Sequence, residues 1–175
     1  TGDPIDPELS SWAQGRDGNL YSTAPTGGMN GEGAAFYFSF KTGLVTLLHS
    51  FMGSDGSAPF GGLTLGRDGN FYGTTSAGGA HGVGTVFQIN GTTHAFKTLS
   101  SFTNGNDGGS PYAAPVQGLS GLFYGTTSAG GGAANCGTVY SISPLGVPVP
   151  LHQFAGSAGS DGCTPLAALA LGDDG

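Results

Sequence analysis

An internal repeat of about fifty residues limits the fold of this chain more than any other feature of its sequence. A glycine turn followed by an aromatic residue and a tyrosine recurs, and it places Tyr21, Tyr72 and Tyr124 at intervals of 51 and then 52 residues. Periods of this length are typical of supersecondary units that stack on one another. We therefore expect each repeat to bury its apolar side chains against its neighbours.

The apolar residues within a repeat alternate with a period of two, which indicates strands rather than helices. In the second repeat, Thr85, Phe87 and Ile89 fall on one face and Val86 and Gln88 on the other. Four strands are predicted there, separated by glycine-containing turns, and no helix is expected. They cover residues 62–66, 71–76, 84–89 and 95–102. The sequence thus predicts an all-β fold of tandem four-stranded repeats arranged as β-propeller-like blades, with a β-solenoid or β-sandwich as the alternatives.

The alignment of the repeats also predicts the organisation of the chain. Residues 1–8 are an N-terminal lead-in, residues 9–66 hold the first repeat with its first strand, and residues 67–118 hold the second repeat. Residues 119–172 contain the third repeat and the first strand of an incomplete fourth, and residues 173–175 start the next turn.

The apolar strand after the third repeat is expected to mediate assembly. It contains Leu166, Leu169 and Leu171, and its edge would be left without a partner. We expect it to be buried, either by strand addition to a neighbouring copy or by the rest of a longer chain.

The charge of the chain argues against two classes of partner. Eleven acidic against four basic residues give a formal net charge of −7, which repels nucleic acid and anionic lipid surfaces. The sequence also lacks an apolar run of the roughly twenty residues that a membrane helix needs. We expect neither nucleic-acid binding nor membrane insertion.

One stretch of the second repeat resembles a known tandem repeat. The segment from Leu65 to Gly79, followed by Gly84-Thr85-Val86-Phe87, closely resembles the Gloeobacter/Verrucomicrobium ("GloVer") repeat, and the similarity extends over the chain from about Leu9. The first repeat departs from the pattern at residues 22–25. Proteins of this bacterial family often carry C-terminal surface-sorting segments, so the resemblance implies an extracellular or cell-surface location, and it supplies no catalytic residues.

Both cysteines, Cys136 and Cys163, lie in the third repeat at positions where the other repeats have none. Because two departures in one repeat suggest a pair, we predict a disulfide, with free thiols or a metal site as the alternatives. A disulfide fits an oxidising compartment.

Three aspartates at one repeat position, Asp55, Asp107 and Asp161, lie in glycine-rich loops. Such loops can bind calcium, but each of these has a single carboxylate, which favours a role in forming the turn. We expect no cofactor, with calcium at these residues as the alternative.

Catalysis is not expected. His49 and His152 occupy equivalent positions, and these two together with His81 and His94 are interpreted as structural. The sequence has no Gly-x-Ser-x-Gly motif, and no set of nucleophile, base and orienting acid recurs in the repeats.

Five aromatic residues could form sugar-stacking platforms, although aromatics at regular strand positions more often fill a core. They are Tyr21, Tyr72, Tyr124, Phe60 and Tyr112. The pairs Thr74-Thr75 and Thr126-Thr127 raise a weaker possibility, a flat threonine array for ice or polysaccharide.

We therefore predict a non-enzymatic extracellular or cell-surface repeat protein with a structural, adhesive or assembly-forming role. A lectin-like carbohydrate-binding propeller is the first alternative, and a propeller-type hydrolase or lyase is the second.

Overall fold

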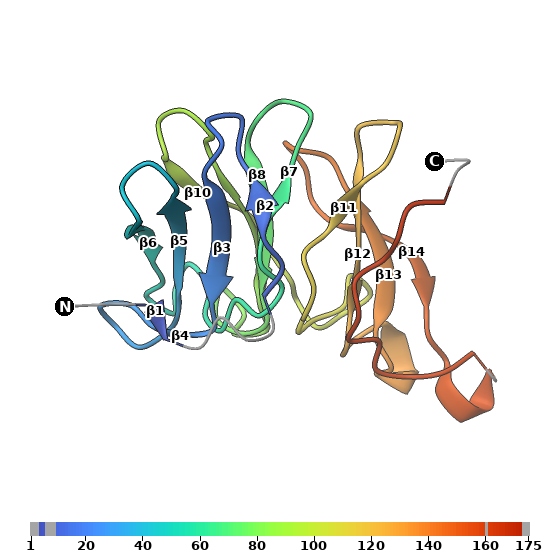
Figure 1. The fold of residues 1–175 in the computed structure, drawn as a ribbon. Helices are drawn as coiled ribbons and strands as arrows, with labels where there is room; N and C mark the ends of the chain where they lie inside the picture. The colour runs from blue at the N-terminus through green and yellow to red at the C-terminus, as the bar shows by residue number, and fades with distance from the viewer. Residues whose placement is uncertain (1–3, 6–9, 160, 173–175) are drawn as a thin grey trace.

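The computed structural model describes residues 4–5, 10–159 and 161–172, and it consists of three four-stranded antiparallel sheets (Figure 1). Each sheet is formed by one continuous stretch of chain, as the repeat predicts. The first sheet has the order β2 (Ala13–Gln14), β3 (Leu20–Ala24), β5 (Ala34–Ser39) and β6 (Leu44–Ser50). The second has β7 (Thr64–Leu65), β8 (Phe71–Thr75), β9 (Thr85–Ile89) and β10 (Phe96–Ser101). The third has β11 (Val116–Gln117), β12 (Phe123–Thr127), β13 (Thr138–Ile142) and β14 (Val149–Gln153).

The remaining elements are short. Strand β1 (Pro4–Ile5) pairs with β4 (Thr26–Gly27) beside the first sheet. Two three-residue 3₁₀ turns, η1 (Gly132–Ala134) and η2 (Gly156–Ala158), occur in the third repeat, and the described residues contain no α-helix. The expected turn at residues 173–175 and most of the lead-in 1–8 lie outside the described residues.

The first hairpin of each sheet is fixed by its turn chemistry. Gly18, Gly69 and Gly121 have φ near +84°, a conformation that costs glycine little because it has no Cβ. In the first two sheets the preceding aspartate also accepts a backbone hydrogen bond, from Asn19 to Asp17 and from Asn70 to Asp68. The turns therefore set the register in which Leu20, Phe71 and Phe123 face one side of their sheets and the following tyrosines face the other.

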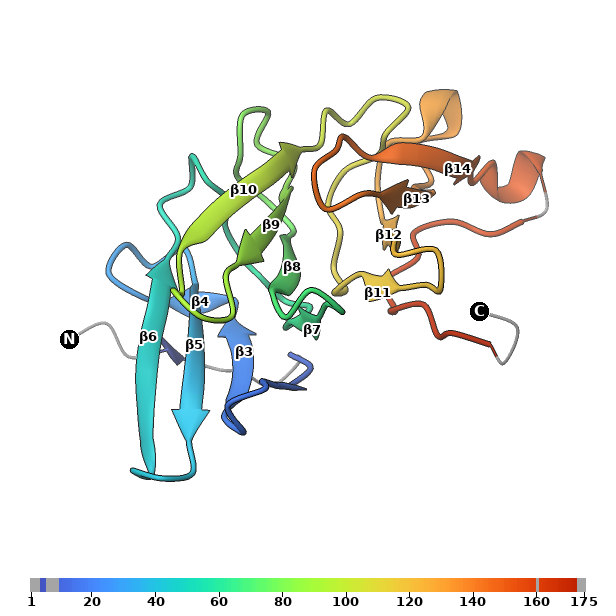
Figure 2. The same cartoon turned by 90° about the horizontal axis from the view of Figure 1, so that it is seen from above.

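The sheets pack face to face in chain order, and strands pair within a repeat rather than between repeats (Figure 2). Tyr21 of the first sheet stacks on Phe71 of the second, with ring centroids 4.0 Å apart. Tyr72 of the second sheet meets Phe123 of the third at the same distance of 4.0 Å. The described residues do not close a ring, but two successive interfaces are built in the same way.

Each interface has its own hydrophobic core. Between the first and second sheets the buried residues are Ala13, Tyr21, Ala35, Phe51, Leu63, Phe71, Phe87 and Ile89. Between the second and third they are Tyr72, Val86, Phe102, Phe123, Tyr140 and Ile142. The middle sheet thus contributes one face to each core, because alternate residues of a strand point to opposite sides.

Buried threonines link strands inside the second and third sheets. The hydroxyls of Thr75 and Thr85 lie 2.9 Å apart, and those of Thr127 and Thr138 repeat this distance. The first sheet has the apolar pair Ala24 and Ala34 at the same register position. Because Thr74, Thr75, Thr126 and Thr127 are all buried, the threonine surface array considered from the sequence is wrong.

We predict that Phe123→Ala lowers the free energy of unfolding by about 3–5 kcal/mol, because it removes a buried ring from the second core and leaves a cavity. Urea denaturation measures the change. The matched control is Leu145→Ala, whose side chain is 90% exposed and should alter stability by less than about 0.5 kcal/mol. Equal effects of the two changes would contradict the assignment of the core.

Candidate functional site

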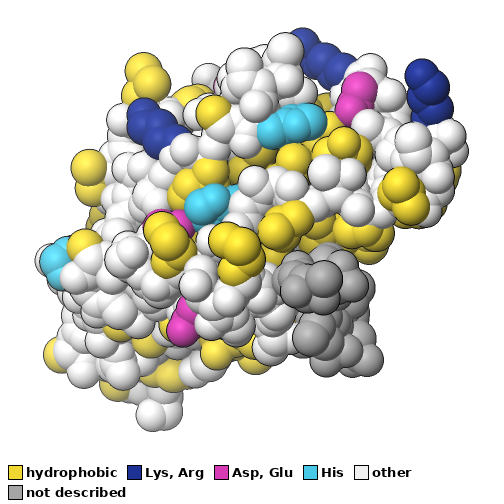
Figure 3. Space-filling view, turned by 90° about the vertical axis from the view of Figure 1, so that its left-hand side faces the viewer, with side chains coloured by type: hydrophobic (Ala, Val, Ile, Leu, Met, Phe, Trp, Pro, Cys, Tyr) yellow, Lys and Arg dark blue, Asp and Glu magenta, His cyan; other side chains and the backbone are white. Residues whose placement is uncertain are grey.

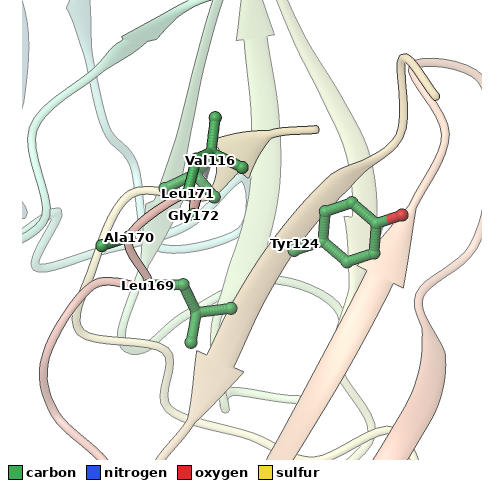
Figure 4. A pocket seen from close by; sticks show the side chains of 6 residues that line it. All are labelled: Val116, Tyr124, Leu169, Ala170, Leu171 and Gly172. Carbon is green, nitrogen blue, oxygen red and sulfur yellow. The ribbon is translucent and has the colours of Figure 1, made fainter. Parts of the chain in front are cut away.

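The third sheet carries an open pocket on the side that faces away from the second sheet (Figure 4). Its volume is about 230 Å³, and more of its lining is apolar than polar. Strands β11 and β12 and the segment that follows the disulfide provide the walls. The lining residues are Val116, Tyr124, Leu169, Ala170, Leu171 and Gly172.

Tyr124 at this pocket is the third member of the tyrosine series. Tyr21 and Tyr72 are 0% and 1% exposed because the next sheet covers them, whereas Tyr124 is half-buried. Tyr21 and Tyr72 therefore fill the cores between the sheets, which is the role favoured from the sequence, and the alternative of sugar platforms fails at these two residues because neither ring offers a free face. Of the three tyrosines, Tyr124 keeps an accessible surface.

The segment Leu166–Leu171 lines this pocket but does not form the predicted strand. It has no regular secondary structure, and the Thr126 hydroxyl donates to the Ala167 carbonyl at 3.2 Å, as the Thr74 hydroxyl donates to the Ala113 carbonyl at 3.0 Å. The segment thus holds the place that the start of the third repeat holds on the second sheet. No described strand pairs with its outer edge, and Leu166 and Leu171 are 55% and 51% exposed.

A disulfide between Cys136 and Cys163 holds this segment against the third sheet, with Cα atoms 4.4 Å apart. The Thr164 amide also donates to the Cys136 carbonyl at 2.8 Å. The same backbone hydrogen bond joins the other sheets to their outgoing segments, from Ala58 to Glu32 and from Ser110 to Val83. The disulfide therefore adds a covalent link to a connection that the other repeats make by hydrogen bonding.

The three loop aspartates are engaged inside their own loops. Asp55, Asp107 and Asp161 each accept a hydrogen bond from a backbone N–H a few residues earlier, at 2.8 to 3.0 Å. Asp55 also contacts His49 at 2.7 Å, Asp161 contacts His152 at 2.8 Å, and Asp107 accepts from the Thr103 hydroxyl. Among the described residues no group of three or more His, Cys, Asp or Glu side chains could hold a metal ion. These hydrogen bonds within the loops are those expected of aspartates that form the turns.

The tyrosine hydroxyls are tethered to the hairpin turns. Tyr21 donates to Asp17 at 2.8 Å and Tyr72 donates to Asp68 at 2.7 Å. Burial, followed by the hydrogen bond to Asp68, raises the pKa of Tyr72 to about 12. Partial burial alone would raise the pKa of Asp68, but hydrogen bonds from Tyr72 and Asn70 outweigh it and bring the pKa below its usual value. Each pair therefore favours a neutral tyrosine beside an ionised aspartate.

One polar cluster was not predicted from the sequence. His94, which has φ of 59° in the turn between β9 and β10, places Nε2 3.3 Å from the Tyr21 hydroxyl and its ring 5.5 Å from Tyr37. No histidine occupies the corresponding turn in the other repeats, so comparison of the repeats could not find it. Burial and Asp17 raise the pKa of Tyr21 well above its usual value, which makes its hydroxyl a poor nucleophile at neutral pH.

The other aromatic candidates lie on the segments that enter the second and third sheets. Phe60 and Tyr112 stack with ring centroids 5.3 Å apart, and Tyr112 is 38% exposed. Unlike Tyr21 and Tyr72, this pair reaches the surface.

A further apolar surface lies on the side of the molecule that carries β6 (Figures 1 and 3). Figure 3 shows hydrophobic side chains gathered there into a band. On β6 the exposed members are Leu44, Val45 and Leu47. Val45 and Leu47 pair with Phe38 and Phe36, so they face away from the second sheet. Apolar area is therefore open at both ends of the row of sheets.

The described residues include no helix with the length and hydrophobicity needed to span a membrane.

Comparison with known proteins gives one family match. The model of the Gloeobacter/Verrucomicrobia repeat matches residues 7–175. No curated protein matches the chain. Among solved structures, the chain is similar to PorZ, described as an essential bacterial surface component of the type-IX secretion system of Porphyromonas gingivalis, with 15% identity and a TM-score of 0.45. The similarity covers 81% of this chain and 20% of that chain, and a likeness at this level carries no argument about function.

We predict that removing the disulfide with the double variant Cys136→Ser/Cys163→Ser lowers the free energy of unfolding by roughly 3 kcal/mol, because the loop it closes regains freedom in the unfolded chain. Urea denaturation with and without reductant measures this. Reductant should destabilise the wild-type protein to the same extent and leave the variant unchanged. A reductant effect on the variant would contradict the prediction.

We also predict a loss of stability at alkaline pH. Because the pKa of Tyr72 rises from 10.0 to about 12 on folding, its contribution is fully present below pH 10 and is lost as the pH rises toward 12. Unfolding free energies measured from pH 9 to pH 12 test this. Tyr72→Phe removes the ionisable hydroxyl and should make the decline shallower, without abolishing it, because Tyr21 and Tyr140 also have raised pKa values. An unchanged slope in the variant would refute the assignment.

Proposed function

Because the chain belongs to the Gloeobacter/Verrucomicrobia repeat family, we propose that it is a non-enzymatic structural module of the cell exterior. Its role is to hold a row of β-sheets rigidly in place and to present the surfaces of that row to neighbouring molecules. The disulfide between Cys136 and Cys163 supports the location, since disulfides persist in oxidising compartments.

The observation that carries this proposal is that the Asp and His side chains make structural contacts. Aspartates that could act as acids or bases instead hold turns and tyrosines, as Asp68 does for Tyr72. His49 stacks on Phe96 of the next sheet with centroids 3.6 Å apart while it contacts Asp55. Side chains that could act in catalysis are thus used to hold strands and sheets together.

A second candidate function, carbohydrate binding, rests on Phe60 and Tyr112. A stacked aromatic pair with a partly exposed ring is the kind of surface on which a sugar ring packs. Because the two residues come from successive repeats, such a site would depend on the stacking of the sheets.

The test combines a glycan array with a panel of chromogenic ester and glycoside substrates and polysaccharide lyase substrates, applied to the full chain. The structural proposal predicts neither turnover nor glycan binding. Turnover that is lost in His94→Ala, with the circular dichroism spectrum unchanged, would overturn the proposal in favour of an enzyme. Glycan binding that is lost in Tyr112→Ala but kept in the exposed control Met29→Ala would instead establish the second candidate.

A further inference from the structure

The two interfaces between sheets show what normally covers the pocket beside Tyr124. In the first interface Tyr21 packs with Leu63, Leu65 and Phe71, and Phe71 is the residue paired with Leu65. At the open end, Tyr124, Leu169 and Leu171 hold the positions of Tyr21, Leu63 and Leu65 in the repeat. Among the described residues none takes the position of Phe71 at this end. The pocket lies where that ring would pack.

The backbone of residues 169–171 also lacks a strand partner among the described residues. Thr64 pairs with Tyr72 and Leu65 with Phe71, and Val116 and Gln117 repeat these pairings with Tyr124 and Phe123. Ala170 and Leu171 occupy the same repeat positions, and among the described strands none pairs with them. An extended strand can therefore add to this edge without displacing one that is already bound.

Other residues on the same face of the third sheet are more exposed than their equivalents in the first sheet. The His49 side chain is 19% exposed beneath Phe96, whereas the equivalent His152 side chain is 52% exposed. Leu48 packs against the first core, whereas the equivalent Leu151 is 56% exposed. The exposed surface thus extends across the third sheet, as the packing of a further sheet on it would require.

We propose that this face is a docking site for a strand of another repeat of the same kind, which would present an aromatic residue followed by tyrosine. The aromatic ring fills the pocket against Tyr124, as Phe71 packs on Tyr21 and Phe123 on Tyr72. The backbone of the strand pairs with Ala170 and Leu171, and the rest of the incoming sheet covers Leu151 and His152. This proposal rests on the structural role proposed above and names its partner.

The experiment adds a synthetic peptide with the sequence of residues 67–76, the strand β8 and its turn, to the isotope-labelled full chain. Chemical shifts of Tyr124 and of residues 169–171 are followed by NMR up to millimolar peptide. We expect saturable changes confined to the third-sheet face. A peptide carrying Phe71→Ala should bind at least about tenfold more weakly, because the pocket loses its ring. No change at these residues, or equal binding of both peptides, would overturn the proposal.

Two protein variants locate the binding. Leu171→Asp alters a residue that is already 51% exposed, so the protein should stay folded and lose peptide binding. Leu145→Asp, at a 90% exposed turn position, should bind as the wild type does. In a second copy the Phe71 and Phe123 rings are already buried, so it cannot offer the proposed strand. Concentration-dependent shifts of the same residues without peptide would therefore assign the face to another surface of a second copy and overturn the proposal. Its failure stays distinct from that of the structural role, which the substrate panel tests separately.

Discussion

The contact on which the architecture depends is the stacking of a tyrosine from one sheet on a phenylalanine from the next. Tyr21 on Phe71 and Tyr72 on Phe123 lie at the centre of the two hydrophobic cores, and both contacts have the same centroid separation of 4.0 Å. The tyrosine of each pair is also tethered to its own turn through an aspartate, which fixes the orientation of the ring at the interface. A single pleated strand can serve two interfaces because adjacent residues, such as Phe71 and Tyr72, point to opposite sides.

The polar residues have a complementary role at the edges of these cores. Low charge leaves few ion pairs to hold the chain, so hydroxyls, amides and backbone carbonyls do so instead. The Thr85 hydroxyl joins its strand neighbour Thr75 and also reaches the Asp55 carbonyl of the incoming segment. Most buried hydroxyls in proteins are hydrogen-bonded, and the Thr85 hydroxyl takes its partners from its own sheet and from the segment that precedes it.

The sequence predicted most of the fold, because its period of two and its turn glycines are local signals. The predicted strands of the second repeat differ from the observed ones by one or two residues at their ends. The fate of individual side chains was harder to predict. Tyr21 and Tyr124 are identical in type and repeat position, yet one is buried and the other borders a pocket, because exposure depends on a neighbouring sheet rather than on local sequence. Leu166–Leu171 has the repeat position of a strand but lacks a described partner, and His94 reaches Tyr21 across 73 residues of chain.

Each interface draws its residues from two adjacent repeats and from no others. The number of sheets is therefore not set by any of the contacts described, and a duplicated gene segment would bring with it both the face that receives a neighbour and the face that offers one. Lengthening such a protein by a whole unit needs no compensating substitutions at the junction, whereas inserting half a unit would break the alternation of the face that offers a ring and the face that receives it. The register of the repeat thus acts as a rule about which changes in length the lineage can tolerate.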